Sequence, residues 1–306
     1  MSVMYERVAL IGLGLIAGSM SLAMRRAGVA GEITGYARSA QTRDTARELG
    51  LVDRVCESAS DAVKDADLVV LAVPVGAMGT VMQEIAPALK QGAVVTDVGS
   101  VKKDIFASVL PHLPENVEFI GTHPMAGTEH SGPTAGFAEL FDKRWCLIVP
   151  TETSTDVEIE RLEAFWHALG ADTKRMDADH HDLVCAVVSH TPHLIAYTMV
   201  GVADDLSRVT DQEVIEFSAA GFRDFTRIAA SDPTMWRDVF LSNKEATLEI
   251  LGRFTEELFA LQRAIRQGDG DHLHEYFTRT RAIRRGIIEA GQDTDAPNFG
   301  RNSDAS

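Results

Sequence analysis

Cysteine is scarce in this chain of 306 residues. The three cysteines, Cys56, Cys146 and Cys185, lie far apart and show neither a Cys-x-x-Cys pair nor the Cys/His spacing of a zinc motif. This spacing excludes the disulfide framework of a small secreted protein and offers no zinc motif. We therefore expect a protein that binds no metal ion and folds in a reducing compartment.

Positive charge is also in short supply, because 29 Lys and Arg face 45 Asp and Glu, for a net charge of -16. Such a chain repels nucleic acid and anionic membrane surfaces, so neither is an expected partner. No uninterrupted apolar run reaches the ~18 residues that cross a bilayer, and the amino terminus lacks the pattern of a signal peptide. These absences predict a cytoplasmic protein.

The first half of the chain alternates short β-branched runs with segments of helical periodicity, which predicts a parallel sheet covered by helices on both faces. We expect this α/β domain to span residues 1–177. The predicted strands are residues 8–12, 32–36, 67–74, 93–99, 117–124, 145–150 and 171–176.

The β-branched runs stop after Asp177, and the pattern becomes wholly helical. We expect a helical domain over residues 178–290 that buries its faces in a homodimer, and a polar, disordered tail over 291–306. The predicted helices are residues 178–204, 211–229, 233–268 and 270–290. A stripe with helical spacing is expected in the core or at the dimer interface, formed by Phe254, Leu258, Leu261 and Ile265.

A glycine-rich segment, GLGLIAGS at residues 12–19, lies between the first predicted strand and an amphipathic helix. Gly12 would permit a tight turn, Gly14 would let backbone N–H groups approach a pyrophosphate, and Gly18 would let helix and strand pack closely. The alternative is a turn without a ligand. This context predicts a Rossmann-type doubly wound domain whose cofactor contacts Gly12, Gly14, Leu15, Ile16, Gly18 and Val73.

The end of the second predicted strand lacks the acid that usually binds the ribose 2′-hydroxyl of NAD. It carries Ala37, Arg38 and Ser39 instead. Arg38 and Ser39 suit a 2′-phosphate, which favours NADP slightly over NAD. The alternative is that Arg38 only stacks on the adenine, which either cofactor allows.

Four further clusters carry polar side chains that are suited to chemistry. They are TDVGSVK (96–102), GTHPMAGTEHSG (121–132), HHDLVCAVVSHTPHLIAY (180–197) and GFRDFTRIAASDPTMWRDVF (221–240). With these motifs the chain, from about residue 6 to residue 290, closely resembles the prephenate/arogenate (cyclohexadienyl) dehydrogenase family of tyrosine biosynthesis. The resemblance implies oxidative decarboxylation of prephenate, arogenate or both, with hydride transfer to NAD(P)+, giving 4-hydroxyphenylpyruvate or tyrosine.

The resemblance also implies roles for two residues at predicted strand ends. His123 would accept the proton of the substrate hydroxyl, a role that suits a neutral imidazole with a pKa near 6.5. Ser100 would bond both His123 and that hydroxyl. The alternative for Ser100 is an N-cap of a helix that starts at Val101.

Substrate carboxylates require cations, and Arg227 matches the family arginine that pairs with the ring carboxylate. The alternative for Arg227 is a surface salt bridge to Asp224. A partly protonated His193 would hold the side-chain carboxylate of prephenate, and Glu129 would bind the amine of arogenate, so we expect both substrates with some preference for prephenate. Other residues expected at this pocket are Thr128, Asp182, Ser189, His190 and Trp236.

Two other functions remain open from the residues alone. One is a β-hydroxyacid or pyrroline-carboxylate type oxidoreductase, and the other is a non-catalytic module that senses NAD(P)H. The chain carries neither the chorismate mutase segment nor the regulatory domain of some family members, so we expect a monofunctional enzyme.

Overall fold

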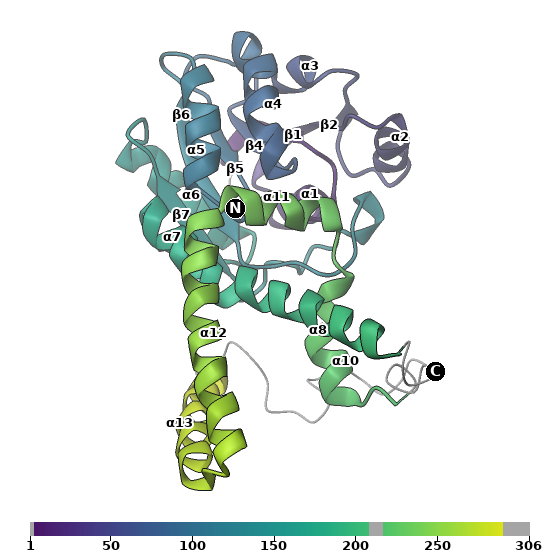
Figure 1. The fold of residues 1–306 in the computed structure, drawn as a ribbon. Helices are drawn as coiled ribbons and strands as arrows, with labels where there is room; N and C mark the ends of the chain where they lie inside the picture. Colours follow the sequence, from purple (N-terminus) through teal and green to yellow (C-terminus); the bar gives the residue numbers. More distant parts are fainter. Residues whose placement is uncertain (1–2, 208–216, 290–306) are drawn as a thin grey trace. The chain divides into compact units, whose positions relative to one another are not determined.

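The computed structural model describes residues 3–207 and 217–289 (Figure 1). The predicted tail, 291–306, and residues 211–216 of a predicted helix lie outside the described residues. Contacts within the chain define two compact units, Met1–Leu248 and Glu249–Ser306. The predicted domain boundary at residue 177 separates the α/β part of the sequence from the helical part, which is a different criterion from compactness. That boundary stays a prediction.

Within residues 3–207, eight strands form one sheet in the order β3-β2-β1-β4-β5-β6-β7-β8. The order reverses between β1 and β4, as in a doubly wound fold. The strands are β1 (Tyr5–Ile11), β2 (Ala30–Tyr36), β3 (Arg54–Val55), β4 (Leu68–Leu71), β5 (Val94–Asp97), β6 (Glu118–Pro124), β7 (Trp145–Pro150) and β8 (Asp172–Arg175).

The expectation of a wholly parallel sheet is wrong at one position, because β7 runs antiparallel to β6. A parallel crossover normally needs a helix between the strands, and residues 125–144 contain only the short 3₁₀ turn η4 (Pro133–Ala135). Strand β3 was also not predicted. Its two residues are too short for a periodic pattern.

The expectation that helices cover both faces of the sheet is confirmed. Val8 and Leu10 of β1 pack with helices α1 and α6, whereas Ala9 and Ile11 pack with α3, α4 and α5. This alternation follows from the pleat of the strand. The helices of this half are α1 (Leu15–Ala27), α2 (Ala40–Glu48), α3 (Ala59–Val63), α4 (Met78–Ile85), α5 (Lys103–Val109) and α6 (Asp156–Ala168), with 3₁₀ turns η1 (Val75–Ala77), η2 (Ala86–Ala88) and η3 (Leu110–His112).

The described residues after Asp177 are helical, as the sequence predicts. Asn243 divides the predicted helix 233–268 in two, because its backbone leaves the helical conformation. The segments are α7 (Ala178–Cys185), the π-helical turn η5 (Ala186–His190), α8 (Thr191–Ser207), α10 (Ala220–Thr226), the 3₁₀ turn η6 (Arg227–Ala230), α11 (Pro233–Ser242), α12 (Lys244–Gln267) and α13 (Gly270–Glu289).

Helix α11 extends the apolar core of the sheet. Trp236 and Val239 are buried in the same cluster as Val69 and Leu71 of β4. The helix also contacts η1, where Asp238 lies beside Gly76. The packing of α11 therefore brings the second half of the chain to the carboxyl end of β4.

One helical stretch, Ala178–Leu206, is long enough and apolar enough to span a membrane by length and composition, since 18 consecutive residues within it have a mean hydropathy of 1.4. The sequence prediction concerned uninterrupted apolar runs. This stretch is interrupted by polar residues, but its apolar residues outnumber them. His181, Asp182 and His190 of this stretch are buried within the protein. Its exposed apolar side chains include Leu183, Val187, Val188, Met199, Val200, Val202 and Leu206.

In the second unit, the predicted stripe on α12 is mostly exposed. Phe254, Leu258 and Ile265 are 37%, 51% and 67% exposed, respectively. Side chains that remain this open do not form the core of a single chain. Of the two expectations for the stripe, an interface between subunits therefore fits better.

Candidate active site

The residues expected at the site follow the ends of four neighbouring strands. Ile11 of β1 lies in register with Leu71 of β4, which lies beside Asp97 of β5, which in turn lies beside Gly121 of β6. Gly12, Val73, Ser100 and His123 come at or just after these positions in the chain. The strand register thus places the expected cofactor and catalytic residues along one edge of the sheet, at the point where the strand order reverses.

The glycine-rich turn fits the pyrophosphate of a dinucleotide. Gly12 has a φ of 99°, and a Cβ there would lie 2.3 Å from the Ala72 carbonyl oxygen, so only glycine fits. Gly14 is extended and caps α1 without a side-chain hydrogen bond. The first N–H groups of α1, at Leu15 and Ile16, therefore remain available for an anion.

The reason given for Gly18 from the sequence is wrong. A Cβ on Gly18 would make only ordinary contacts, 3.6 Å from Leu51 and from the Pro133 carbonyl oxygen. The close approach is made by Gly136, whose added Cβ would lie 3.0 Å from the Gly18 carbonyl carbon. Gly18 therefore accommodates the loop before β7 rather than the neighbouring strand.

At the end of β2, Arg43 supports the backbone that carries Arg38, and its own charge is paired with Glu57 at 2.9 Å. The Arg38 side chain is exposed, and Ser39 caps α2 by accepting a hydrogen bond from the Thr42 N–H. Arg43 donates to the carbonyls of Ala37 and Arg38 at 2.9 and 3.1 Å. Arg43 thus fixes the backbone that carries Arg38, a contact that the short motif could not reveal.

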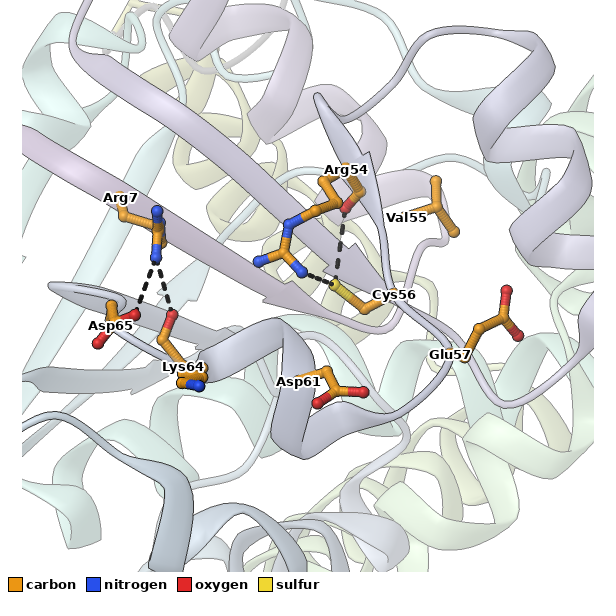
Figure 2. A pocket seen from close by; sticks show the side chains of 8 residues that line it. All are labelled: Arg7, Arg54, Val55, Cys56, Glu57, Asp61, Lys64 and Asp65. Carbon is orange, nitrogen blue, oxygen red and sulfur yellow. Dashed lines mark hydrogen bonds and ion pairs between the residues drawn. The ribbon is translucent and has the colours of Figure 1, made fainter.

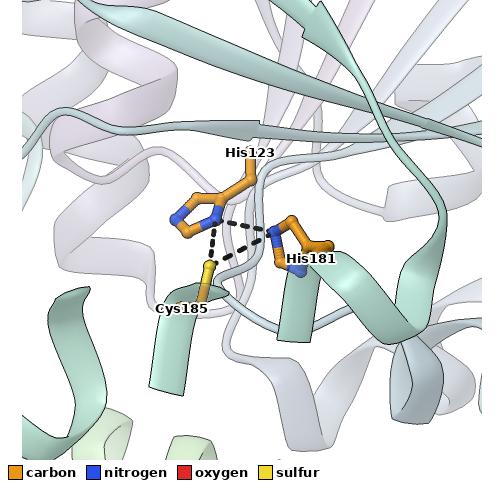
Figure 3. A group of neighbouring side chains, drawn as sticks. All are labelled: His123, His181 and Cys185. Carbon is orange, nitrogen blue, oxygen red and sulfur yellow. Dashed lines mark hydrogen bonds between the residues drawn. The ribbon is translucent and has the colours of Figure 1, made fainter. Parts of the chain in front are cut away.

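His123 lies near the end of β6 and is 8% exposed. Its Nδ1 lies 2.9 Å from His181 Nε2 and 3.5 Å from Cys185 Sγ, both on α7. Figure 3 shows that the other ring nitrogen points away from both neighbours. The ring is therefore fixed through Nδ1 and leaves Nε2 for a ligand.

Asp182 hydrogen-bonds the other ring nitrogen of His181 and the backbone at the start of α5. One carboxylate oxygen accepts from His181 Nδ1 at 2.8 Å and from the Lys102 N–H at 2.7 Å. The second oxygen accepts from the Lys103 N–H at 3.0 Å. Asp182 thus caps α5 from another part of the chain.

This contact corrects the alternative considered for Ser100. Helix α5 begins at Lys103 and not at Val101, and no side chain within its own loop caps it. Ser100 is half-buried and, within the described chain, makes no hydrogen bond to His123. A Ser100–His123 contact therefore remains an expectation for the substrate complex.

A buried ion pair holds the loop that carries Ser100. The Lys102 ammonium donates to Asp97 Oδ2 at 2.5 Å and to the Gly99 carbonyl at 2.8 Å, and both charged side chains are fully buried. Asp97 also accepts from the Gly99 N–H at 2.8 Å. Removing either charge would leave its partner buried and unpaired, so the pair fixes the loop.

Burial shifts the titration of this cluster. Burial, followed by the electrostatic effects of His181 and Lys102, lowers the pKa of His123 well below its usual value. Burial and Lys102 lower the pKa of His181 to about 2, and burial lowers that of His190 to about 4. The three imidazoles are therefore neutral near pH 7. The expectation of a pKa near 6.5 for His123 is thus corrected.

Three ligand atoms also meet the distance requirement for a metal ion. Nδ1 of His123, Nε2 of His181 and Sγ of Cys185 lie within 4.8 Å of one another. The expectation that no such set exists was wrong, because sequence spacing cannot detect residues that only the fold brings together. Hydrogen bonding accounts for the close contact between the two histidines, so the cluster does not itself require a metal.

His190 faces the same region from η5. Its Nδ1 accepts from Asn243 Nδ2 at 3.0 Å, so its proton resides on Nε2. That Nε2 is buried and has no hydrogen-bond partner among residues 3–207 and 217–289, although the Ser100 backbone lies close enough to raise its pKa. A buried donor without a partner can serve a polar group of a ligand.

Arg227 pairs with Glu129 at 2.8 Å, and both side chains are partly exposed. This contact joins η6 to the loop after β6, and it is a different pairing from the Asp224 bridge that was the alternative for Arg227. The pKa of Glu129 lies below its usual value, through a backbone hydrogen bond and Arg227. Thr128, next to Glu129, accepts from the His130 N–H.

His193 stacks on Trp236, with ring centroids 3.7 Å apart. Its Nδ1 donates to the Ser189 carbonyl at 2.8 Å, and burial lowers its pKa. His193 is therefore neutral at pH 7, contrary to the expectation of a partly protonated ring. Trp236 is buried, and its ring supports that of His193.

Sequence reasoning missed His181, Cys185, Asp97 and Lys102. All four lie within the motifs named above, but nothing in the local sequence distinguishes them from ordinary helix or loop residues. One sequence signal could have pointed to them. Ionisable side chains occupy helix positions that face the core, as in the segment HHDLVC. Only the packing of α7 against β6 and α5 reveals their contacts.

A separate surface hollow lies beside β3 and α3 (Figure 2). Its charged side chains balance in sign: Arg7, Arg54, Lys64, Glu57, Asp61 and Asp65. Arg7 already contacts Asp65 and the Lys64 carbonyl. None of the expected site residues lines this hollow, so we assign it no role in catalysis.

A sheet edge that binds a dinucleotide, with helices that add substrate contacts, is the arrangement of a nucleotide-dependent dehydrogenase. Two family models cover the chain: "Prephenate dehydrogenase, nucleotide-binding domain" matches residues 20–174, and "Prephenate dehydrogenase, dimerization domain" matches residues 177–279. The chain therefore belongs to the prephenate dehydrogenase family.

Individual relatives agree with this assignment. Cyclohexadienyl dehydrogenase of Zymomonas mobilis is 39% identical over 280 residues, which cover 92% of this chain and 95% of that protein. Prephenate dehydrogenase of Bacillus subtilis is 32% identical, covering 94% and 77%. The crystal structure of prephenate dehydrogenase from A. aeolicus with hydroxyphenyl propionate and NAD+ has a TM-score of 0.85 and 32% identity, covering 92% and 98%.

Proposed function

We propose that this protein catalyses the NAD(P)-dependent oxidative decarboxylation of prephenate, arogenate or both, in tyrosine biosynthesis. The observation that carries the proposal is the buried, neutral His123, whose Nε2 points away from His181 and Cys185 at the same sheet edge as the glycine-rich turn. Family membership supports the substrate class.

A nicotinamide bound at this edge would supply the oxidant that accepts a hydride from the ring carbon bearing the hydroxyl. His123 Nε2 takes the hydroxyl proton as that hydride leaves. Loss of the ring carboxylate as carbon dioxide then makes the ring aromatic, and His123 returns the proton to the new phenol oxygen. Since no proton is consumed overall, a weakly basic imidazole is sufficient.

The remaining expected residues act by positioning. Ser100 would hold the substrate hydroxyl near His123, because the buried Asp97–Lys102 pair fixes its loop. Arg227 would bind the ring carboxylate in place of Glu129, its partner in this structure. Holding both reacting groups in place supplies much of the rate, since aromatisation itself is favourable.

The choice between prephenate and arogenate depends on His193. With Nδ1 donating to the Ser189 carbonyl, a neutral ring offers a lone pair at Nε2, which suits the ammonium of arogenate. A carboxylate requires a donor there, so prephenate would have to bind the protonated ring. We therefore expect the KM for prephenate to rise with pH above the lowered pKa of His193, while the KM for arogenate does not.

The test is the formation of reduced nicotinamide from prephenate and from arogenate, each with NAD+ and with NADP+. His193→Ala should weaken use of prephenate more than use of arogenate at low pH. Neither a pyrroline-carboxylate type reductase nor a nucleotide-sensing module would reduce the cofactor with these substrates. Absence of product with all four combinations would overturn the proposal.

We also propose a homodimer, since the chain matches a dimerization domain and exposes the apolar stripe on α12. Light scattering coupled to size exclusion would measure the mass directly. Leu258→Glu should shift the protein toward the monomer, because a charge at an apolar interface is left unpaired.

A further inference from the structure

We infer that His181 is a positioning residue that holds His123 with its proton on Nδ1 and its lone pair on Nε2. The inference rests on the proposed function for its catalytic meaning. His181 does not touch the substrate in the proposed mechanism and was not among the expected site residues. It acts through a chain of contacts that runs from Asp182 through His181 to His123.

The chain of contacts begins at Asp182. Both carboxylate oxygens already accept backbone N–H groups, from Lys102 and Lys103, at the start of α5. These donors stabilise the ionised form, which can only accept hydrogen bonds. The group facing Asp182 Oδ1 at 2.8 Å, which is His181 Nδ1, must therefore carry a proton.

The proton on His181 Nδ1 determines which nitrogen of His123 carries a proton. A neutral His181 with its proton on Nδ1 has a lone pair on Nε2. That Nε2 lies 2.9 Å from His123 Nδ1, so His123 Nδ1 must be the donor. His123 is then left with its lone pair on Nε2, the nitrogen that points away from α7 in Figure 3.

This tautomer of His123 is the one that can act as a base in the proposed reaction. In the other tautomer, His123 would carry its proton on Nε2 and could not accept the hydroxyl proton. When Nε2 does accept that proton, the O–H bond breaks and an N–H bond forms, while Nδ1–H stays bonded to His181. The proton returns to the phenol oxygen by the reverse transfer, so His181 never gains or loses one.

The other ionisable neighbours do not supply this contact. Lys102 is committed to Asp97 and to backbone carbonyls, and His190 bonds Asn243. Cys185 lies 3.5 Å from His123 Nδ1 and 3.6 Å from His181 Nε2, and thiols form only weak hydrogen bonds. Burial raises the pKa of Cys185 to about 12, so it stays a neutral thiol.

Kinetics of three variants test the inference. His181→Phe removes the acceptor and should lower kcat on the order of 10²-fold, with KM and cofactor affinity near wild type, as expected for a base in the wrong tautomer. His181→Gln can place an amide oxygen near His123 Nδ1 and should recover most of that loss. Cys185→Ala, in the same cluster, should change kcat less than about twofold. A His181→Phe enzyme no slower than Cys185→Ala would overturn the inference.

A measurement on the wild-type protein is independent of activity and of the folding of variants. With ¹⁵N-labelled histidine, His123 should show a protonated Nδ1 and an unprotonated Nε2, its signals being assigned by their absence in His123→Asn. The opposite tautomer would overturn the inference. So would a change of these signals on adding a chelator, because a metal would then occupy Nδ1. If wild-type enzyme lacks activity, the proposed function fails while this measurement still decides the tautomer.

Discussion

At the scale of single residues, the proposed base is weak but always available. Burial and nearby positive charge lower the pKa of His123, so the ring is neutral throughout the physiological range. A base that must return its proton gains nothing from a higher affinity for it. Burial therefore lowers the basicity of His123 and also excludes water from the site.

His123→Asn should reduce kcat by roughly 10² to 10⁴-fold, the usual range for loss of a general base. Because His123 lies on β6 and not on the glycine-rich turn that is expected to bind the cofactor, cofactor affinity should stay near wild type. Stopped-flow binding and steady-state turnover separate the two. A variant within a few fold of wild type would remove His123 from the mechanism.

The lowered pKa of His123 also predicts a pH profile. The basic form is required, and it is lost only when the pH falls below that lowered value. The kcat should therefore show no acid limb near pH 6.5, the ordinary value for histidine. A half-maximal kcat near that pH would show that the catalytic base is not buried as described.

The Arg227–Glu129 pair predicts opposite effects on the two substrates. Glu129→Gln frees Arg227 for a carboxylate and should lower the KM for prephenate about two- to fivefold, the size of a partly exposed ion pair. The same change should raise the KM for arogenate, because its amine would lose the Glu129 carboxylate and keep only the neutral His193 as an acceptor. Glu139→Gln, an exposed acid in the same loop, is the matched control, and Arg227→Ala should raise the KM for both substrates.

At the scale of elements, two loops between strands and helices define the cofactor and catalytic edge. The turn after β1 fits only glycine at residue 12, and the loop after β5 is fixed by Asp97 and Lys102. Helix α7 adds the cap of α5 through Asp182. These contacts link the two halves of the site within the first compact unit.

The end of β2 predicts the preference between cofactors. Arg38 is exposed, and Arg43 fixes its backbone, so a 2′-phosphate has a charged donor, whereas Ala37 offers NAD no acceptor. We expect use of both cofactors, with NADP at least equal to NAD by kcat/KM. Ala37→Asp should shift the preference toward NAD by repelling the phosphate.

A wild-type enzyme at least about tenfold better with NAD would contradict this prediction, and would show that Arg38 only stacks on the adenine. Ala37→Ser is the control, since it adds a polar group without a charge.

At the scale of the whole molecule, buried neutral histidines make stability depend on pH. The unfolded chain protonates histidine below about pH 6.5, whereas folded His190 does so only below about 4. Stability should therefore fall as the pH drops from about 6.5 toward 4, by about 2 kcal/mol at pH 5 for each such histidine. Above pH 7 these groups contribute no pH dependence.

Urea unfolding at about pH 7.5 and about pH 5 measures this effect. His190→Gln should reduce the loss on acidification by about 2 kcal/mol, while His180→Gln, an exposed neighbour on α7, should leave it unchanged. Equal pH dependence in both variants would show that His190 titrates normally in the folded protein.

The sequence by itself determined the doubly wound sheet, the helical second half and the glycine-rich turn. These features depend on periodicity and on backbone conformations that local residues specify, as at Gly12. The pairing of Arg227 with a loop almost a hundred residues away was not of this kind, and neither was the direction of β7. Each depends on which elements pack together, which a local pattern does not encode.

Only the tertiary structure decided the state of the proposed base. A histidine before a proline at a strand end is compatible with many roles and with an ordinary pKa. The packing of α7 against β6 and α5 buries His123, lowers its pKa and places His181 and Asp182 behind it. Burial and tautomer arise from contacts between residues far apart in the chain, so the fold had to form before either was defined.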